Sequence, residues 1–292
     1  METRINTCLV CNSDNLSALK GYEFHGLAYC SSCGMVFHRH VVPEEILQKH
    51  YTAYPESDLP SDVTVKRYNE ILDRLEHQRK NNTILDVGCG EGYFLEEALK
   101  RGWDAYGTEY AERYVKNCSD KGIKMRSGKL QVQDFKDLKF DVICSFEVIE
   151  HIQNPQEEIR IFNKLLRDGG IVYLTTPNFN SISRNLLGEK WNIISVPDHL
   201  AYYTPKTLTR LFKECGFRKL QIKTEGISIS RLKSSVSKSE NVFSGTAGIS
   251  EDRRIQEKAE NSLLWKLAKS TINGILNLSG KGDNLKSYFI KA

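Results

Sequence analysis

Residues 84–92 of this 292-residue chain are Ile84-Leu85-Asp86-Val87-Gly88-Cys89-Gly90-Glu91-Gly92, an apolar strand that runs into a turn with three glycines. Glycine lets a backbone turn sharply and lets a ligand approach with no Cβ in the way. The spacing differs from the G-x-G-x-x-G of dinucleotide-binding folds, which seats a pyrophosphate on a helix terminus. Asp86 and Glu91 would repel a pyrophosphate, whereas they suit a ligand that carries an ammonium and a sulfonium. The stretch therefore predicts a cationic ligand at Asp86, Gly88, Gly90 and Gly92.

Short apolar strands alternate with helical patterns beyond this turn. Strands are predicted over 83–87, 104–108, 123–125, 141–145 and 171–175, and helices near 93–101, 110–121 and 156–167. Alternation of this kind predicts a parallel sheet with helices on both faces. Helices over 43–54 and 62–80 precede the sheet, and a helix over 205–215 and strands over 218–224 and 285–290 extend it.

A further acid, Glu109, ends the next predicted strand, roughly 20 residues beyond the turn, where such folds hold ribose hydroxyls. A carboxylate can accept two hydrogen bonds from a vicinal diol, so an acid suits this position. A glycine turn alone is also compatible with a tight turn that binds nothing. The order of strand, acidic glycine turn, helix, strand and acid favours a bound nucleoside.

Four motifs in residues 82–226 show a family resemblance. They are Leu85-Asp86-Val87-Gly88-Cys89-Gly90-Glu91-Gly92, Phe140-Asp141-Val142-Ile143, Glu150-His151-Ile152, and Leu165-Leu166-Arg167-Asp168-Gly169-Gly170 leading to Thr176-Pro177-Asn178. In this order they resemble the class I S-adenosylmethionine-dependent methyltransferases, in the broad subfamily that acts on small molecules, sugars and lipids. The resemblance implies an α/β, Rossmann-like sheet of seven strands, of which the last, near 288–290, is antiparallel.

The resemblance also assigns a cofactor site for S-adenosylmethionine. It implies that the glycine turn faces the methionine moiety and that Glu109, followed by Tyr110, binds the ribose. Further residues complete the implied site: Lys129 and Leu130 border the adenine, and Ser145 and Phe146 line the methionine side. A helical insert at about 228–282 departs from the family pattern and leaves the substrate open.

Four of the 8 cysteines form two pairs, Cys8-x-x-Cys11 and Cys30-x-x-Cys33, separated by 18 residues. This spacing allows four thiolates to converge on a structural Zn²⁺, whose binding can fold a segment that has few large apolar side chains. The alternatives are a redox pair, or a site in which His25 or His38 replaces one cysteine. A closed four-thiolate site has no open position for catalysis. The other cysteines are expected to be small buried residues, namely Cys89, Cys118, Cys144 and Cys215.

A zinc ribbon joined to a methyltransferase resembles two groups of enzymes. One group tailors sugars and surface polysaccharides, and the other methylates guanine in ribosomal RNA. The stretch Cys30 to Phe37, with Pro43-Glu44-Glu45 and the helix that carries Tyr51 and Tyr54, is more similar to the first group. Residues 1–45 contain few Lys or Arg and no basic-aromatic run of the kind that follows a phosphate backbone, so no nucleic-acid partner is expected.

The length predicts one large domain and a small accessory one. We expect a zinc ribbon over 1–42, a helical linker over 43–81 and a methyltransferase domain over 82–292. The formal charge of +4 is mild, and neither a secretory signal nor a long apolar span is present, which predicts a cytoplasmic protein. The amphipathic helix over 264–278 is expected to pack on its own domain or a second subunit, with membrane contact as the alternative.

Methyl transfer to a hydroxyl requires a base near the methyl group. His199 and His151 are the candidates, and we favour His199, oriented by Asp198, because it lies in an aromatic loop after the fifth strand. Each histidine is also compatible with a structural role. The sequence thus predicts O-methylation of a sugar, nucleotide sugar or related small metabolite in polysaccharide or secondary-metabolite biosynthesis. The alternatives are an RNA base methyltransferase, a quinone-type or lipid O-methyltransferase, and a non-catalytic scaffold.

Overall fold

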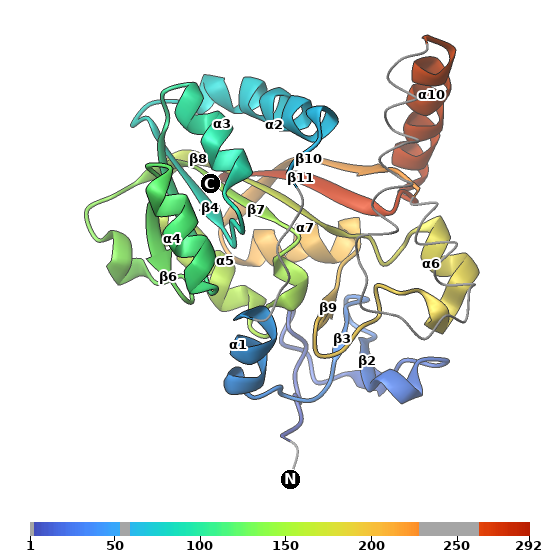
Figure 1. Ribbon diagram of the computed structural model, residues 1–292. Coiled ribbons are helices and arrows are strands. Elements are labelled where there is room, and N and C mark those ends of the chain that lie inside the picture. The colour runs from blue at the N-terminus through green and yellow to red at the C-terminus, as the bar shows by residue number, and fades with distance from the viewer. Residues whose placement is uncertain (1–2, 53–58, 228–262) are drawn as a thin grey trace.

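A seven-stranded sheet with the order β10-β11-β8-β7-β4-β5-β6 forms the centre of the computed structural model, which describes residues 3–52, 59–227 and 263–292 (Figure 1). Strand β11 is antiparallel to both of its neighbours, whereas the pairs among β4, β5, β6, β7 and β8 are parallel. The predicted α/β fold, with seven strands and an antiparallel last strand, is confirmed. The strands are β4 (Thr83–Val87), β5 (Asp104–Glu109), β6 (Lys124–Ser127), β7 (Phe140–Phe146), β8 (Leu166–Pro177), β10 (Phe217–Glu225) and β11 (Asn284–Lys291).

The predicted helices form, and polar side chains fix several of their starts. Ser61, Asn154 and Thr204 each accept a hydrogen bond from a backbone N–H in the first turn of the helix that follows. Helix α5 ends at Leu165, two residues earlier than predicted, because Leu166 already pairs with Phe140 in the sheet. The helices are α1 (Glu44–Thr52), α2 (Asp62–Leu75), α3 (Tyr93–Lys100), α4 (Glu112–Asp120), α5 (Pro155–Leu165), α6 (Ile182–Leu187), α7 (Pro205–Glu214) and α10 (Leu263–Ser279), with 3-10 turns η1 (Glu23–His25), η2 (Glu76–Gln78), η3 (Val132–Phe135), η4 (Ile149–His151) and η5 (Gly188–Lys190).

Two hydrophobic cores cover the two faces of the sheet. On one face α2, α3 and α4 pack through residues such as Leu72 and Leu95. On the other face α5 and α7 pack against β7, β8 and β11, and the Phe212 ring stacks on Phe289 with centroids 3.8 Å apart. Residues of one strand alternate between the two cores, as Ile84 and Leu85 do in β4, which is the pattern of a sheet buried on both faces.

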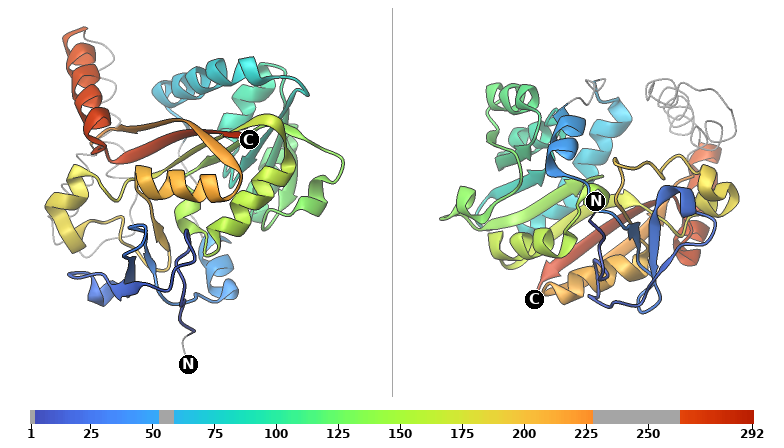
Figure 2. Two further views of the ribbon diagram at one scale, coloured as in Figure 1. Left: turned by 180° about the vertical axis from the view of Figure 1, so that it is seen from behind. Right: turned by 90° about the horizontal axis from the view of Figure 1, so that it is seen from below.

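The N-terminal segment builds a second sheet, with the order β1-β2-β3-β9. Its last strand, β9, comes from the loop after β8, so the N-terminal strands lie beside that loop (Figures 1 and 2). Met35 and Phe37 belong to the same core as α7, and the Gln156 amide of α5 donates to the carbonyl of Val10. The segment therefore packs directly on the large sheet's own helices. Its strands are β1 (Leu16–Ala18), β2 (Leu27–Cys30), β3 (Val36–His38) and β9 (Ala201–Tyr202).

Helix α10 spans the whole of the predicted helix at 264–278, and its end near β10 is anchored. Leu276 is buried, and Asn277 Oδ1 accepts a hydrogen bond from the Thr224 N–H. Ile275 and Leu278 are exposed. Within the part of the chain that the structure describes, no helix is long and apolar enough to cross a membrane. Residues 228–262, the larger part of the predicted helical insert at about 228–282, lie outside the described residues.

Candidate active site

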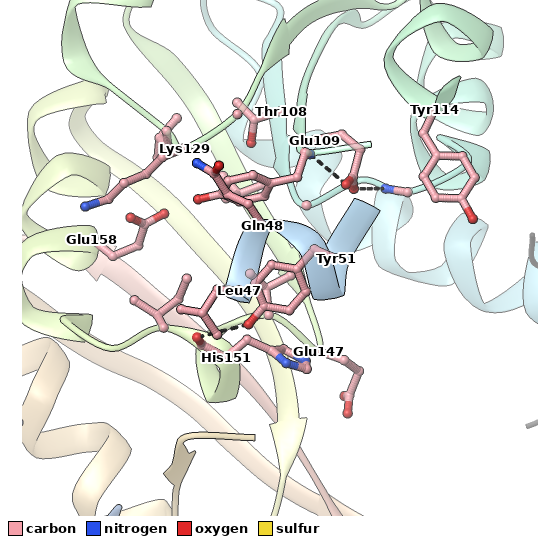
Figure 3. A pocket seen from close by; sticks show the side chains of 18 of the residues that line it. Leu47, Gln48, Tyr51, Thr108, Glu109, Tyr114, Lys129, Glu147, His151 and Glu158 are labelled. Atoms are coloured by element: carbon pink, nitrogen blue, oxygen red, sulfur yellow. Dashed lines mark hydrogen bonds between the residues drawn. The ribbon is translucent and has the colours of Figure 1, made fainter. Parts of the chain in front are cut away.

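A cavity of about 520 Å³ opens at the carboxyl ends of β4, β5 and β7. This volume lies in the range of roughly 300–1,000 Å³ that is usual for small-molecule sites, and the edge is where open α/β sheets bind ligands. Helix α1 closes one side: Leu47, Gln48 and Tyr51 line the cavity, and the Tyr51 hydroxyl donates to the backbone carbonyl of His151 over 3.4 Å (Figure 3). The site therefore combines a sheet edge with a helix from the N-terminal part of the chain.

Two of the three glycines of the turn line the cavity, and the third permits close packing of α4. All have positive φ, and Gly88 and Gly90 line the cavity. A Cβ on Gly90 would meet no atom within 4 Å, so this position faces open space. A Cβ on Gly92 would lie 2.6 Å from Cys118 Sγ, which shows that the close packing of α4 requires this glycine. Gly92 is absent from the cavity wall.

Of the predicted acids Asp86 and Glu109, only Glu109 lines the cavity. Asp86 is buried, burial raises its pKa well above the usual value, and it does not line the cavity. Glu109 lines the cavity and accepts hydrogen bonds from the backbone N–H groups of Gly90 at 3.0 Å and Tyr110 at 2.7 Å (Figure 3). The Glu109 carboxylate thus ties the glycine turn to the end of β5 and still borders the cavity.

The remaining predicted cofactor residues mostly reach the wall, where Tyr110, Lys129, Leu130 and Phe146 are found, whereas Ser145 is buried behind it. Sequence reasoning missed several lining residues, because no local motif shows that α1 and the start of α5 turn toward the sheet edge. Among them Glu158 is buried, which raises its pKa to about 7 despite Lys129 nearby. The missed residues include Glu44, Leu47, Gln48, Tyr51, Thr108, Tyr114, Glu147, Asn154 and Glu158.

The two candidate histidines are neighbours, but only one of them lines the cavity. His151 is on the wall and His199 is not, although their ring centroids lie 4.8 Å apart. His151 Nδ1 donates to the Asp198 carbonyl over 2.7 Å, which leaves Nε2 as the proton acceptor of the neutral ring. His199 Nδ1 donates to the Ile193 carbonyl over 2.6 Å.

Acidic groups surround His151. The Asp198 carboxylate lies 3.4 Å from His151 Nδ1, and it also lies 3.1 Å from His50 Nε2 and 3.7 Å from His199 Nε2. Glu150 is buried and accepts a hydrogen bond from the Thr176 hydroxyl. Burial lowers the pKa of His151, but Asp198 and Glu150 outweigh burial and raise the value to about 9.

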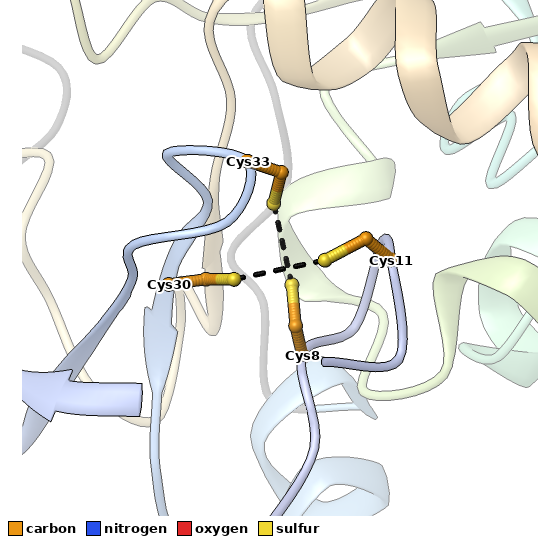
Figure 4. Close-up of side chains that lie close together, drawn as sticks. All are labelled: Cys8, Cys11, Cys30 and Cys33. Atoms are coloured by element: carbon orange, nitrogen blue, oxygen red, sulfur yellow. Dashed lines mark hydrogen bonds between the residues drawn. The ribbon is translucent and has the colours of Figure 1, made fainter. Parts of the chain in front are cut away.

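The four N-terminal cysteines converge, as the sequence predicted they would. Cys8 Sγ lies 3.5 Å from Cys33 Sγ, and Cys11 Sγ lies 3.6 Å from Cys30 Sγ (Figure 4). All four sulfurs lie within 4.8 Å of one another, and neither His25 nor His38 belongs to the group. A tetrahedral zinc with Zn–S bonds of about 2.3 Å would place its sulfurs about 3.8 Å apart, so this donor set fits Zn²⁺.

Comparisons with known proteins find similarity to methyltransferases. A family model described as "Methyltransferase domain" matches residues 61–222, more than half of the chain. The chain is 29% identical over 154 residues to a "Probable S-adenosylmethionine-dependent methyltransferase" of Mycolicibacterium smegmatis, covering 52% of this chain and 58% of that protein. It is 27% identical to a ubiquinone biosynthesis O-methyltransferase of Cereibacter sphaeroides, covering 46% and 59%. The matches span about three fifths of the relatives' own length.

A solved structure shares the fold. The S-adenosylmethionine-dependent methyltransferase from Archaeoglobus fulgidus superposes with a TM-score of 0.52 at 16% identity, covering 86% of this chain and all of that one.

Proposed function

The chain belongs to the methyltransferase domain family, and on this premise we propose that it transfers the methyl group of S-adenosylmethionine to a hydroxyl of a sugar or related small metabolite. One observation carries the choice of a hydroxyl acceptor. His151, a base whose free nitrogen is Nε2, lines the same cavity as the glycine turn. An oxygen nucleophile must lose a proton during transfer, which makes a positioned base valuable.

The residues of the wall suit the parts of the methyl donor. Glu109 would accept hydrogen bonds from the ribose diol, and Lys129 and Leu130 would border the adenine, near Glu158. Gly90, where a Cβ would meet open space, leaves room for the methionine moiety beside Phe146, and Gly88 also lines the cavity. The sulfonium is already a good leaving group, so the protein chiefly aligns the acceptor and removes its proton.

Substitution of the turn glycines should separate binding from folding. In Gly90→Ala the new Cβ enters the cavity and φ is +52°, so we expect the dissociation constant for S-adenosylmethionine to rise at least about tenfold. In Gly92→Ala the Cβ meets buried Cys118, so the free energy of unfolding should fall by about 1–3 kcal/mol. Calorimetric titration and urea unfolding measure the two effects. Gly122→Ala, also at positive φ but in open space, is the control for backbone strain alone.

The rate should depend on pH through His151. Asp198, Glu150, His199 and Tyr51 face this ring, and its pKa is raised to about 9. Below that pH the ring is mostly protonated and cannot accept the acceptor's proton, so kcat/KM should rise about tenfold per pH unit between pH 6 and 8 and level off near pH 9. A profile that is flat over this range would remove His151 from proton transfer.

The N-terminal segment fits a structural role. Its four cysteines would hold Zn²⁺ in a closed site, and the proposed organisation remains a ribbon over 1–42, a linker over 43–81 and the methyltransferase domain over 82–292. The pairing of β3 with β9 supports a role in placing the loop that carries Asp198 and His199. Zinc would act there through folding and not through the reaction.

A screen for methyl incorporation tests the acceptor. The purified chain would be supplied with labelled S-adenosylmethionine and with nucleotide sugars, free sugars, quinol-like phenols or RNA. Label in the sugars is the expected result. A phenol is the second candidate, because relatives of similar sequence are named ubiquinone biosynthesis O-methyltransferases. Label in phenols or RNA, with none in any sugar, would overturn the proposal.

A further inference from the structure

A second cavity, of about 340 Å³, lies next to the cofactor cavity. The two share Phe146 and Glu147, the residues at the end of β7. The second cavity extends from there between α2 and the strands β8, β10 and β11. Glu147 has a left-handed backbone with φ +53°, which is uncommon for a residue other than glycine and is often found at functional sites.

Aromatic rings form one wall of this second cavity. The Phe146 ring lies 6.0 Å from Tyr68 and 5.5 Å from Tyr173, and Tyr173 lies 4.7 Å from Tyr288, centroid to centroid. Tyr68, Tyr173 and Tyr288 all line the cavity. A wall of this kind suits the apolar face of a sugar ring or a nucleobase, and its phenolic hydroxyls can bond to polar groups.

Four cations line the same cavity, from three different elements. Arg67 and Arg74 come from α2, Lys223 from β10 and Lys286 from β11. Lys286 Nζ pairs with Glu225 at 2.8 Å. In residues 3–52, 59–227 and 263–292, no carboxylate oxygen lies within ion-pair distance of the other three cations.

Among the described residues, the acids of this cavity form no direct ion pair with those three cations, although Glu225 lies close enough to interact electrostatically with Lys223 and Arg74. Glu225 is paired with Lys286, and Glu70 and Glu147 are exposed to solvent. Glu147 lies at the junction with the cofactor cavity, beside the region that would hold the sulfonium. The positive charge is therefore displaced from the junction toward α2 and β10.

We propose that this second cavity binds the methyl acceptor and that Arg67, Arg74 and Lys223 recognise a phosphate or diphosphate group on it. This inference rests on the proposed function. A sugar ring against the aromatic wall would present its hydroxyl at the Phe146–Glu147 junction, while the phosphate lies farther along α2. Guanidinium groups bind phosphate oxygens through paired N–H donors, which gives both affinity and orientation. The acceptor is then a phosphate-linked sugar and not a neutral phenol.

Binding of inorganic pyrophosphate tests the anion site directly. Calorimetry on the full chain saturated with S-adenosylhomocysteine would compare wild type with Arg67→Gln, Arg74→Gln and the double variant. We expect each single change to weaken binding about tenfold and the double change about 100-fold. Lys66→Gln removes the same charge from the same helix outside the cavity and should bind as wild type. Three results would each overturn the site. They are no detectable pyrophosphate binding to the wild type, unchanged pyrophosphate binding by the double variant, and a loss of affinity in Lys66→Gln equal to that in the arginine variants.

Methyl incorporation distinguishes the sources of the phosphate. A nucleoside-diphosphate sugar, a sugar 1-phosphate and the free sugar would be compared at equal concentration. We expect the kcat/KM of the free sugar to be at least about tenfold lower than that of a phosphorylated form. In Arg67→Gln the ratio between these two kcat/KM values should be smaller. Equal or better use of the free sugar would overturn phosphate recognition. Pyrophosphate binding without methylation of any sugar would instead refute the proposed acceptor class and leave the anion site in place.

Discussion

Replacement of Cys30 and Cys33 by serine is expected to release one zinc ion per chain, to unfold the N-terminal segment and to abolish methyl transfer. Loss of zinc should affect the distant active site because the N-terminal segment packs against the large domain. Cys30 and Cys33 belong to the same buried core as Phe37 and Phe212, and β3 pairs with β9. Zinc contributes roughly 10 kcal/mol or more in isolated zinc modules, so its loss should exceed what the remaining contacts of this segment can offset.

The measurements are zinc content by atomic emission, thermal unfolding and turnover of the wild type and the variant. Cys215→Ala is the matched control, because Cys215 lies in the same core and outside the four-sulfur group. It should keep its zinc and most of its activity, with a stability loss of about 1 kcal/mol. Wild-type protein without stoichiometric zinc, or a double-serine variant that keeps full turnover, would contradict the structural zinc site.

The central sheet was predictable because its signals are local. Strand β4 has the predicted bounds, Thr83–Val87. The apolar run identifies the strand, and the glycines that follow it mark where the strand ends. The antiparallel last strand was expected only through the family resemblance. The pairing of β3 with β9 was not predictable, because it joins segments that no sequence period connects.

The cofactor site was predictable in part for the same reason. Gly90 and Glu109 follow directly after strands, and strand ends meet at one edge of a parallel sheet. Tyr51 and Gln48 depend on where α1 docks, which a helical pattern alone does not fix. The favoured base, His199, was chosen from the composition of its loop, whereas contact with the cavity depends on the turn η4, which places His151 on the wall.

Replacement of His151 by Gln is expected to lower kcat by about 10²–10⁴-fold, the usual contribution of a positioned general base. Glutamine keeps a polar side chain near the Asp198 carbonyl but cannot take a proton from the acceptor. The dissociation constant for S-adenosylmethionine should change much less than kcat, because the cofactor contacts many other wall residues. The dependence of kcat/KM on pH should also disappear, since the group whose pKa is raised to about 9 is gone.

His199→Gln separates the two histidines. His199 contacts His151 and the Ile193 carbonyl but does not line the cavity, so its removal should lower kcat less than removal of His151 and leave a pH-dependent rate. If His199 is instead the base, His199→Gln will abolish turnover and His151→Gln will keep a measurable pH-dependent rate. The double variant tests whether the two histidines act independently. If it loses no more kcat than His151→Gln alone, His199 acts only through His151, because the effects of residues that work as a unit do not add.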